Sequence, residues 1–294
     1  ARVRSEGRPN SFLHISKPEI DLPEGTDPYD PSVYAKGAEN LQRLIDDGVL
    51  MREEKPCYYI YRLRWEGHLQ TGLVFGASVA AYDINRVRKH EFTRPVKEDD
   101  RVRQITALKA QTGPVLLTYR ADDAVKAIID ETAAGTPVYD LTADDGIGHT
   151  LWVLDDDAKI EQLNQIFDAT DALYIADGHH RSASASRVAK ENSAESAQYF
   201  LSVAFAHDEM KILDYNRVVR DLHGLSADEL LANAAASFDL ELSAEAVRPA
   251  KPTQFGMYVN GQWYRLDVHE ELVPSDDPVP SLDVSLLHSN LIEP

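Results

Sequence analysis

The longest apolar runs in the first third of the chain are predicted to form two neighbouring strands. Residues 57–65 (CYYIYRLRW) and 69–84 (LQTGLVFGASVAAYDI) are strand-like, and Glu66-Gly67-His68 between them has the length and residue types of a tight hairpin. We therefore expect antiparallel pairing. Before these runs, apolar residues recur near one helical face, which predicts a helix over 31–49 that ends at Gly48.

The middle of the chain alternates between helical and strand-like patterns. Helices are predicted at 96–111, 123–133 and 157–167, and short strands at 115–120, 137–141, 149–154 and 172–176. Such alternation is typical of a mixed α/β sheet. The later segments suggest strands and a short helix over 198–206 and 210–219, a helix at 226–238, and a hairpin at 254–268 that turns at Asn260-Gly261.

These patterns predict a mixed α+β protein in two parts. The first, residues 1–135, is an α/β part with an antiparallel hairpin, and the second, residues 136–294, ends in the later hairpin. We expect the two parts to form one compact unit. Because the first residue is not methionine and the amphipathic tail from Ser281 stops without a terminal signature, we also expect a fragment truncated at both ends.

Charge restricts the partners of this chain. Among 294 residues, 49 acidic and 30 basic side chains give a formal net charge of −19, which opposes binding to nucleic acid or to an anionic membrane surface. No apolar run approaches the roughly 20 residues of a membrane span, and the first residues are too polar for a signal, so we expect a cytoplasmic protein. A small anion can still bind, because a few arginines and backbone amides suffice to hold it.

The strongest candidate site is the sequence Asp177-Gly178-His179-His180-Arg181, between an apolar strand and a helix. The start of a helix presents unpaired N–H groups and a positive dipole, so anions bind there, and an arginine adds a two-pronged contact to phosphate. The glycine lets the backbone approach the ligand. The alternative is structural: Asp177 caps the helix, Arg181 is solvated, and one histidine is a buried polar residue with satisfied hydrogen bonds.

The paired histidines raise the question of a metal site. Adjacent residues point apart, and the chain lacks the further ligands of a closed tetrahedral zinc site, so we predict no metal held by the protein alone. Magnesium that bridges carboxylates and a nucleotide phosphate is compatible with the sequence.

Two further clusters carry polar groups. In RVRKHEFTRPVKEDDR, residues 86–101, His90 and Glu91 fall in a turn, and Lys97 and Arg101 share a helical face. The alternative for this cluster is a solvated, highly charged helix start. In DDGIGHTLWVL, His149 lies beside glycines before a strand, a pattern that is more often structural.

The segment LYIADGHHRSASA, with VRKHEFTRPVKEDDR, GHTLWVL, YNRVV and SLDVSLLHSNLIEP, resembles a family catalogued as domain of unknown function 1015. The resemblance runs in order along nearly the whole chain. That family is similar to the ParB/sulfiredoxin superfamily, in which a Gly-x-x-Arg or Gly-Cys-His-Arg element at a helix start grips nucleotide phosphates. The resemblance implies a ParB/sulfiredoxin-like core, with Gly178, His179, His180 and Arg181 as the phosphate grip.

Some members of the superfamily are kinases that convert free L-serine to O-phosphoserine with ADP or ATP. The resemblance therefore implies a nucleotide and a small hydroxylated metabolite as ligands. Phosphoryl transfer needs a neutralised phosphate and a base for the hydroxyl proton. We assign the first task to His180 and Arg181, and the second to Glu91, with Asp177 as the next choice.

Substrate contacts are assigned to His90, Lys97, Arg101 and His149, with Lys97 and Arg101 on the substrate carboxylate or a second phosphate. Two other classes stay open. One is a nucleotide-binding, ParB-like regulatory module without turnover, and the other is a metal-dependent hydrolase that uses the paired histidines.

Overall fold

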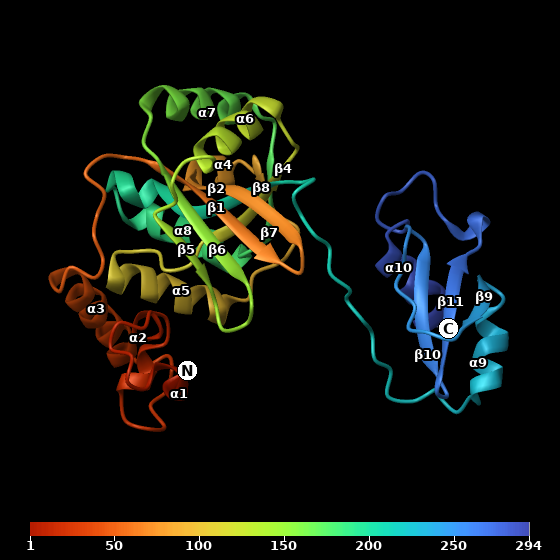
Figure 1. Ribbon diagram of the computed structural model, residues 1–294. Helices are drawn as coiled ribbons and strands as arrows, with labels where there is room; N and C mark the ends of the chain where they lie inside the picture. The colour runs from red at the N-terminus through yellow and green to blue at the C-terminus, as the bar shows by residue number, and fades with distance from the viewer. Residues whose placement is uncertain (294) are drawn as a thin grey trace. The chain divides into compact units, whose positions relative to one another are not determined.

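The computed structural model describes residues 1–293 and divides into two compact units, the first Ala1–Ile212 and the second beginning at Leu213 (Figure 1). The predicted boundary between residues 135 and 136 does not coincide with this division. Residues on both sides of 135 contribute strands to one sheet of the first unit, so no break falls there. The mixed α/β class predicted from the sequence is observed.

An eight-stranded mixed sheet forms the centre of the first unit, in the order β3-β7-β4-β8-β2-β1-β6-β5. Strands β3 and β7, and β4 and β8, pair in parallel, whereas the other neighbours are antiparallel. The strands are β1 Tyr58–Trp65, β2 His68–Ser78, β3 Val87–Arg88, β4 Val115–Tyr119, β5 Tyr139–Thr142, β6 Gly148–Leu154, β7 Leu173–Asp177 and β8 Tyr199–Ala206.

The predicted hairpin between the first two strands is confirmed. Trp65 pairs with His68, so the connection is the two-residue turn Glu66-Gly67. Both turn residues have positive φ, 47° and 79°, which is the backbone of the tight turn that matches the twist of an antiparallel pair.

The predicted helices over 31–49, 96–111, 123–133 and 157–167 are confirmed within a few residues. The helices of the first unit are α1 Arg2–Ser5, α2 Leu13–Ser16, α3 Pro31–Asp46, α4 Val79–Asp83, α5 Pro95–Leu108, α6 Asp123–Ala133, α7 Asp157–Ala169 and α8 His179–Glu191, with short turns η1 Pro18–Asp21 and η2 Glu195–Gln198. The expectation for residues 79–83 was wrong: they were predicted as strand, but they form α4. The Ser78 side chain accepts a hydrogen bond from the Ala81 N–H and starts the helix there.

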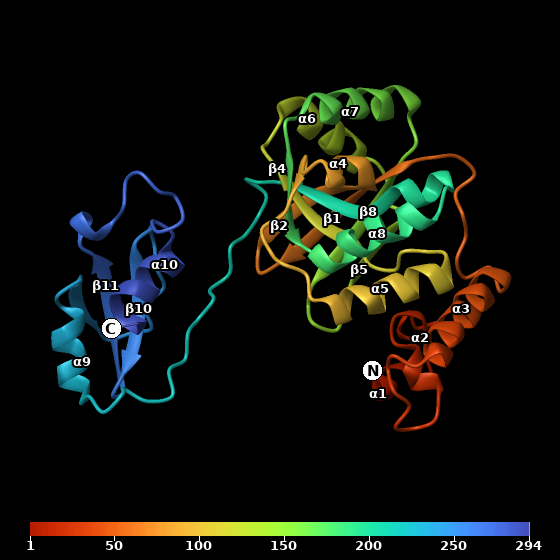
Figure 2. The ribbon, with the colours of Figure 1, turned by 180° about the vertical axis from the view of Figure 1, so that it is seen from behind.

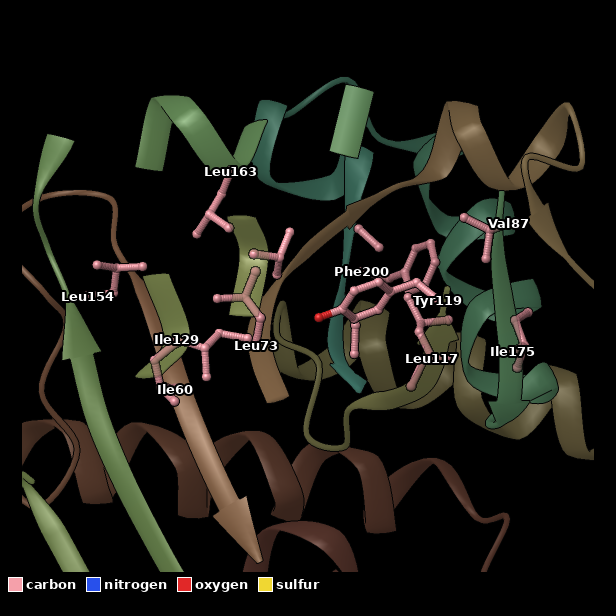
Figure 3. Packing of buried hydrophobic residues seen from close by; sticks show 14 of the residues in the cluster. Ile60, Leu73, Val87, Leu117, Tyr119, Ile129, Leu154, Leu163, Ile175 and Phe200 are labelled. Carbon is pink, nitrogen blue, oxygen red and sulfur yellow. The ribbon is translucent and has the colours of Figure 1, made fainter. Parts of the chain in front are cut away.

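Apolar side chains of the large sheet and of helices α4, α6, α7 and α8 pack together in one buried cluster (Figure 3). Leu117 of β4 and Ile175 of β7 are almost fully buried in it, as is Phe200 of β8. Because Ile175 anchors the last strand before residues 177–181, this core fixes the position of the candidate site. In the view of Figure 2, α8 lies in front of the sheet.

The second unit has its own small core, built around Phe238 and Leu266. Its elements are α9 Ala227–Ala234, β9 Phe238–Ser243, β10 Gln254–Val259, β11 Gln262–Val268, α10 Asp283–Leu287, η3 Glu270–Leu272 and η4 His288–Ile292, and the sheet order is β10-β11-β9. The predicted hairpin at Asn260-Gly261 is confirmed. Strand β9 was not predicted.

The expectation of regular structure over residues 210–219 was wrong. This segment forms neither strand nor helix, and the side chains of Ile212 and Val218 are 90% and 93% exposed. An apolar run becomes a strand only when a neighbour satisfies its backbone groups, and this segment has no paired strand beside it.

Candidate functional site

A sharp turn at Gly178 connects β7 to α8. Gly178 has φ +103°, a left-handed conformation that side chains rarely allow, and it occupies the position before the first helical residue. Within residues 1–293, no side chain caps this helix, so Asp177 is not the helix cap of the structural alternative. The main-chain N–H groups of His179 and His180 have no acceptor in the described part of the chain, and they form an open helix start.

The Arg181 side chain folds back over this turn. Its Nη2 donates to Asp177 Oδ2 at 2.7 Å. Its Nε is buried and has no hydrogen-bond partner among the described residues. A Cβ on Gly178 would lie only 2.8 Å from Nη2 and 2.9 Å from Nε, and a Cβ on Gly113 would lie 3.5 Å from Cδ. A guanidinium with an unused N–H therefore lies directly over the helix start, and two glycines make room for it.

His179 is buried, with 3% of its surface exposed. Its Nε2 accepts the main-chain N–H of His90 at 3.3 Å, and the His90 ring packs edge-on against it at 4.4 Å between centroids. Its Nδ1 lies 3.4 Å from Glu91 Oε2 and has no hydrogen bond of good geometry. Burial, and secondarily the neighbouring His90, lower the pKa of His179, so the ring is neutral near pH 7.

His180 makes the same kind of contact four residues further along the loop. Its Nε2 accepts the main-chain N–H of Arg94 at 3.0 Å. Both histidine rings are thus bound to residues 89–94, the loop between β3 and α5. The sequence placed His90 and Glu91 in a turn, but it gave no sign that Arg94 and the loop backbone contact the histidines.

Helices α5 and α8 pack closely beside the loop. Ser182, Ser184 and Ser186 of α8 are all buried, and small side chains allow this approach. Ser184 Oγ donates to the Glu98 carbonyl at 3.0 Å, and Arg187 Nη1 lies 2.9 Å from the Glu98 carboxylate. These contacts hold the loop, the start of α5 and the start of α8 as one piece.

The side chains of Lys97 and Arg101 make no hydrogen bond or ion pair with the residues of this site. Lys97 is exposed, and it makes no ion pair with any residue from 1 to 293. Arg101 instead bonds to Asp100 at 2.6 Å and to Gln104 at 2.6 Å, in a cavity of about 80 Å³ beside Tyr34 of α3. Burial, together with Asp100, raises the pKa of Tyr34 to about 12. Arg101 therefore belongs to the packing of α5 against α3.

His149 is also distant from the site. It lies on β6, where its Nδ1 is 2.6 Å from the Tyr61 hydroxyl and its ring stacks on the Tyr61 ring. Four strands separate β6 from β7, so at about 4.8 Å per strand the distance across the sheet is roughly 24 Å. The structure thus brings together His90, Glu91, Asp177, Gly178, His179, His180 and Arg181, and leaves Lys97, Arg101 and His149 outside their contacts.

No group of three or more His, Cys, Asp or Glu side chains in residues 1–293 is arranged to hold a metal ion. In the same residues, no helix has both the length and the apolar composition needed to cross a bilayer.

Comparison with known proteins gives one match. Residues 1–285 fit the model of the family described as "Protein of unknown function (DUF1015)". No curated protein and no solved structure matches the chain. Since the family model covers all but the last few residues, the chain belongs to the DUF1015 family.

Proposed function

We propose that this protein is a nucleotide-dependent phosphotransferase that acts on a small hydroxylated metabolite, with free L-serine as the leading acceptor and O-phosphoserine as the product. ADP or ATP would be the donor. We also propose that the sheet around β7 and the α8 helix form a ParB/sulfiredoxin-like core. The resemblance of Gly178, His179, His180 and Arg181 to the phosphate-binding element of that superfamily supports both proposals.

One observation carries the proposal: the Arg181 guanidinium and the unpaired main-chain N–H groups lie together at the start of α8. Arg181 Nε is buried without a partner, and the N–H groups of His179 and His180 point out of an uncapped helix start. A buried donor without an acceptor is costly, about 1–3 kcal/mol, and a phosphate oxygen would remove that cost. Anions bind at helix starts for the same reason.

Glu91 is the leading candidate for the base. Its carboxylate is 58% exposed and lies beside the buried ring of His179, so it faces both solvent and the helix start. In the proposed step, the acceptor hydroxyl oxygen forms a bond to phosphorus, the bridging P–O bond to the nucleotide breaks, and the hydroxyl proton moves to Glu91. Asp177 is the second candidate, although its carboxylate is occupied by Arg181.

Magnesium commonly accompanies nucleotides and takes oxygen ligands, several of them water and phosphate. Among residues 1–293, no three ligating side chains are grouped in a way that could hold a metal ion. No step proposed for the residues of this chain depends on the ion.

A ligand screen followed by a product assay tests the proposal. Thermal unfolding is measured with ADP, ATP, CTP and pyrophosphate, each with and without L-serine, because a ligand that binds the folded state raises the melting temperature. We expect ADP or ATP to raise it, and serine with nucleotide to yield O-phosphoserine. Binding without product for any hydroxylated metabolite would favour the regulatory module, and no stabilisation by any of the four would refute both.

A further inference from the structure

The loop of residues 89–94 is held at both ends by neighbouring side chains of α8. The N–H of His90 donates to His179 Nε2 at 3.3 Å, and the N–H of Arg94 donates to His180 Nε2 at 3.0 Å. The two acceptors are consecutive residues on the first turn of the helix. A pair of adjacent histidines therefore spans the loop from one end to the other.

Few other contacts fix the loop. Phe92, at its tip, is 98% exposed, so this apolar side chain does not anchor the loop. Besides the two imidazole contacts, the Lys89 ammonium lies 3.9 Å from the centroid of the Tyr82 ring, and the His90 ring packs on His179. The Thr93 hydroxyl donates to the Glu98 carboxylate at 2.7 Å, and Glu98 is in turn paired with Arg187 of α8. Because a short exposed loop with few anchors has many accessible conformations, these contacts decide which one it adopts.

The His179 ring fixes a side chain as well as the backbone. A neutral imidazole that accepts through Nε2 carries its proton on Nδ1. That nitrogen lies 3.4 Å from Glu91 Oε2. One buried ring therefore holds the main chain at residue 90 and faces the carboxylate of residue 91.

We propose that His179 and His180 are positioning residues, which clamp the loop 89–94 over the start of α8 and set the place of Glu91 relative to Arg181. Their rings act on the loop and not on the phosphate, whose contacts come from Arg181 and the main-chain amides. The catalytic consequence rests on the proposed function, but the clamp itself does not. It explains why two histidines stand in tandem: adjacent side chains point apart, so they reach two different points of one loop.

Site-resolved hydrogen exchange tests the clamp directly, because its two donors are main-chain amides. We expect His180→Ala to speed exchange at the Arg94 amide by about tenfold, the loss of roughly one hydrogen bond, and His179→Ala to do the same at His90. His180→Gln keeps an acceptor near the Nε2 position and should restore slow exchange at Arg94. If His179→Ala unfolds the buried site, the comparison of His180→Ala with His180→Gln is enough to test the clamp.

A matched control exists elsewhere in the first unit. The N–H of Ala121 donates to His207 Nδ1 at 3.0 Å, the same kind of contact away from the loop. His207→Ala should speed exchange at Ala121 and leave residues 89–94 unchanged. Equal acceleration of the loop amides by His207→Ala would mean general loosening and would overturn the clamp.

Nucleotide titration separates the clamp from the phosphate grip. With ADP as probe, His180→Gln should bind within about threefold of the unmodified protein, whereas His180→Ala should lose turnover more than affinity. Unchanged loop exchange in His180→Ala, together with an affinity loss of tenfold or more, would assign the ring to the phosphate and overturn the proposal. If ADP and ATP do not bind at all, the proposed function fails, and the exchange result still decides the clamp.

Discussion

The guanidinium of Arg181 occupies the space in which a side chain on Gly178 would begin, with its Nη2 only 2.8 Å from an ideal Cβ position. The turn and the cation therefore depend on each other. A methyl group at residue 178 would not collide with rigid backbone but with the end of a flexible side chain, which can move away. A methyl group at residue 178 should therefore displace the Arg181 guanidinium more than the backbone.

Gly178→Ala should lower the free energy of unfolding by about 1 kcal/mol, because φ is +103°, and should also weaken nucleotide binding as Arg181 is displaced. Gly146→Ala is the matched control: it has φ +82° and nothing within 4 Å of the added methyl group. Urea unfolding should show similar losses for both variants. Calorimetric titration should show weaker nucleotide binding for Gly178→Ala alone, and equal affinities would remove Arg181 from the site.

Arg181→Ala should weaken nucleotide binding by about 1.5–3 kcal/mol, the usual contribution of a hydrogen bond to a charged group. The fold should survive, since the side chain is partly exposed and its ion pair is with the exposed Asp177. Lys190→Ala removes a positive charge from the last turn of the same helix and should leave affinity unchanged. A similar loss in both variants would indicate a general charge effect.

Glu91→Gln keeps the shape of the side chain and removes its basicity. If Glu91 is the base, turnover should fall by about 10²–10⁴-fold while nucleotide affinity stays near that of the unmodified protein. O-phosphoserine formation at saturating nucleotide measures the first quantity, and titration calorimetry the second. Turnover within a few-fold would transfer the role to Asp177, for which Asp177→Asn is the corresponding variant.

The buried imidazole of residue 179 should make stability depend on pH. Its pKa in the folded state is lowered from 6.5, chiefly by burial, and the groups around it are His90, Glu91, Asp177 and His180. Below pH 6.5 the unfolded chain binds the proton more readily, so the contribution of this residue to stability is complete above that pH and is lost as the pH falls. His179→Gln keeps an acceptor but does not titrate.

The melting temperature should consequently fall more steeply between pH 7 and pH 5 in the unmodified protein than in His179→Gln. Both proteins share every other titrating group, so the difference between the two curves isolates residue 179. Parallel curves would mean that the folded and unfolded states bind this proton equally.

Local patterns were enough to predict much of the first unit. The hairpin at Glu66-Gly67 follows from two turn residues and their flanking strands, and the helix predicted at 123–133 is observed as α6. The strand expected over 210–219 failed because strand formation depends on a partner, which no local pattern reveals. In the site, by contrast, Gly178 and Arg181 lie three residues apart along the chain and could be grouped from the sequence.

The roles of the two histidines could not be predicted, because their partners at 90 and 94 lie almost ninety residues earlier in the chain. The placement of Arg101 beside the site could not be predicted for a different reason. Helix α5 contacts α3 through Asp100, α2 through Gln104 and α8 through Glu98, so its neighbours lie on more than one face. The spacing of Lys97 and Arg101 shows that they share a face but not which neighbour that face meets.

The position of β8 in the large sheet has a consequence for how the chain folds. It is the last strand of that sheet in the sequence, yet it lies between β4 and β2, so it joins β3-β7-β4 to β2-β1-β6-β5. Until residues 199–206 leave the ribosome, both groups of strands have an unpaired inner edge, and such edges invite wrong pairing and aggregation. Chains that end before Tyr199 should therefore be insoluble or bound by chaperones, and refolding should be limited by insertion of this one strand.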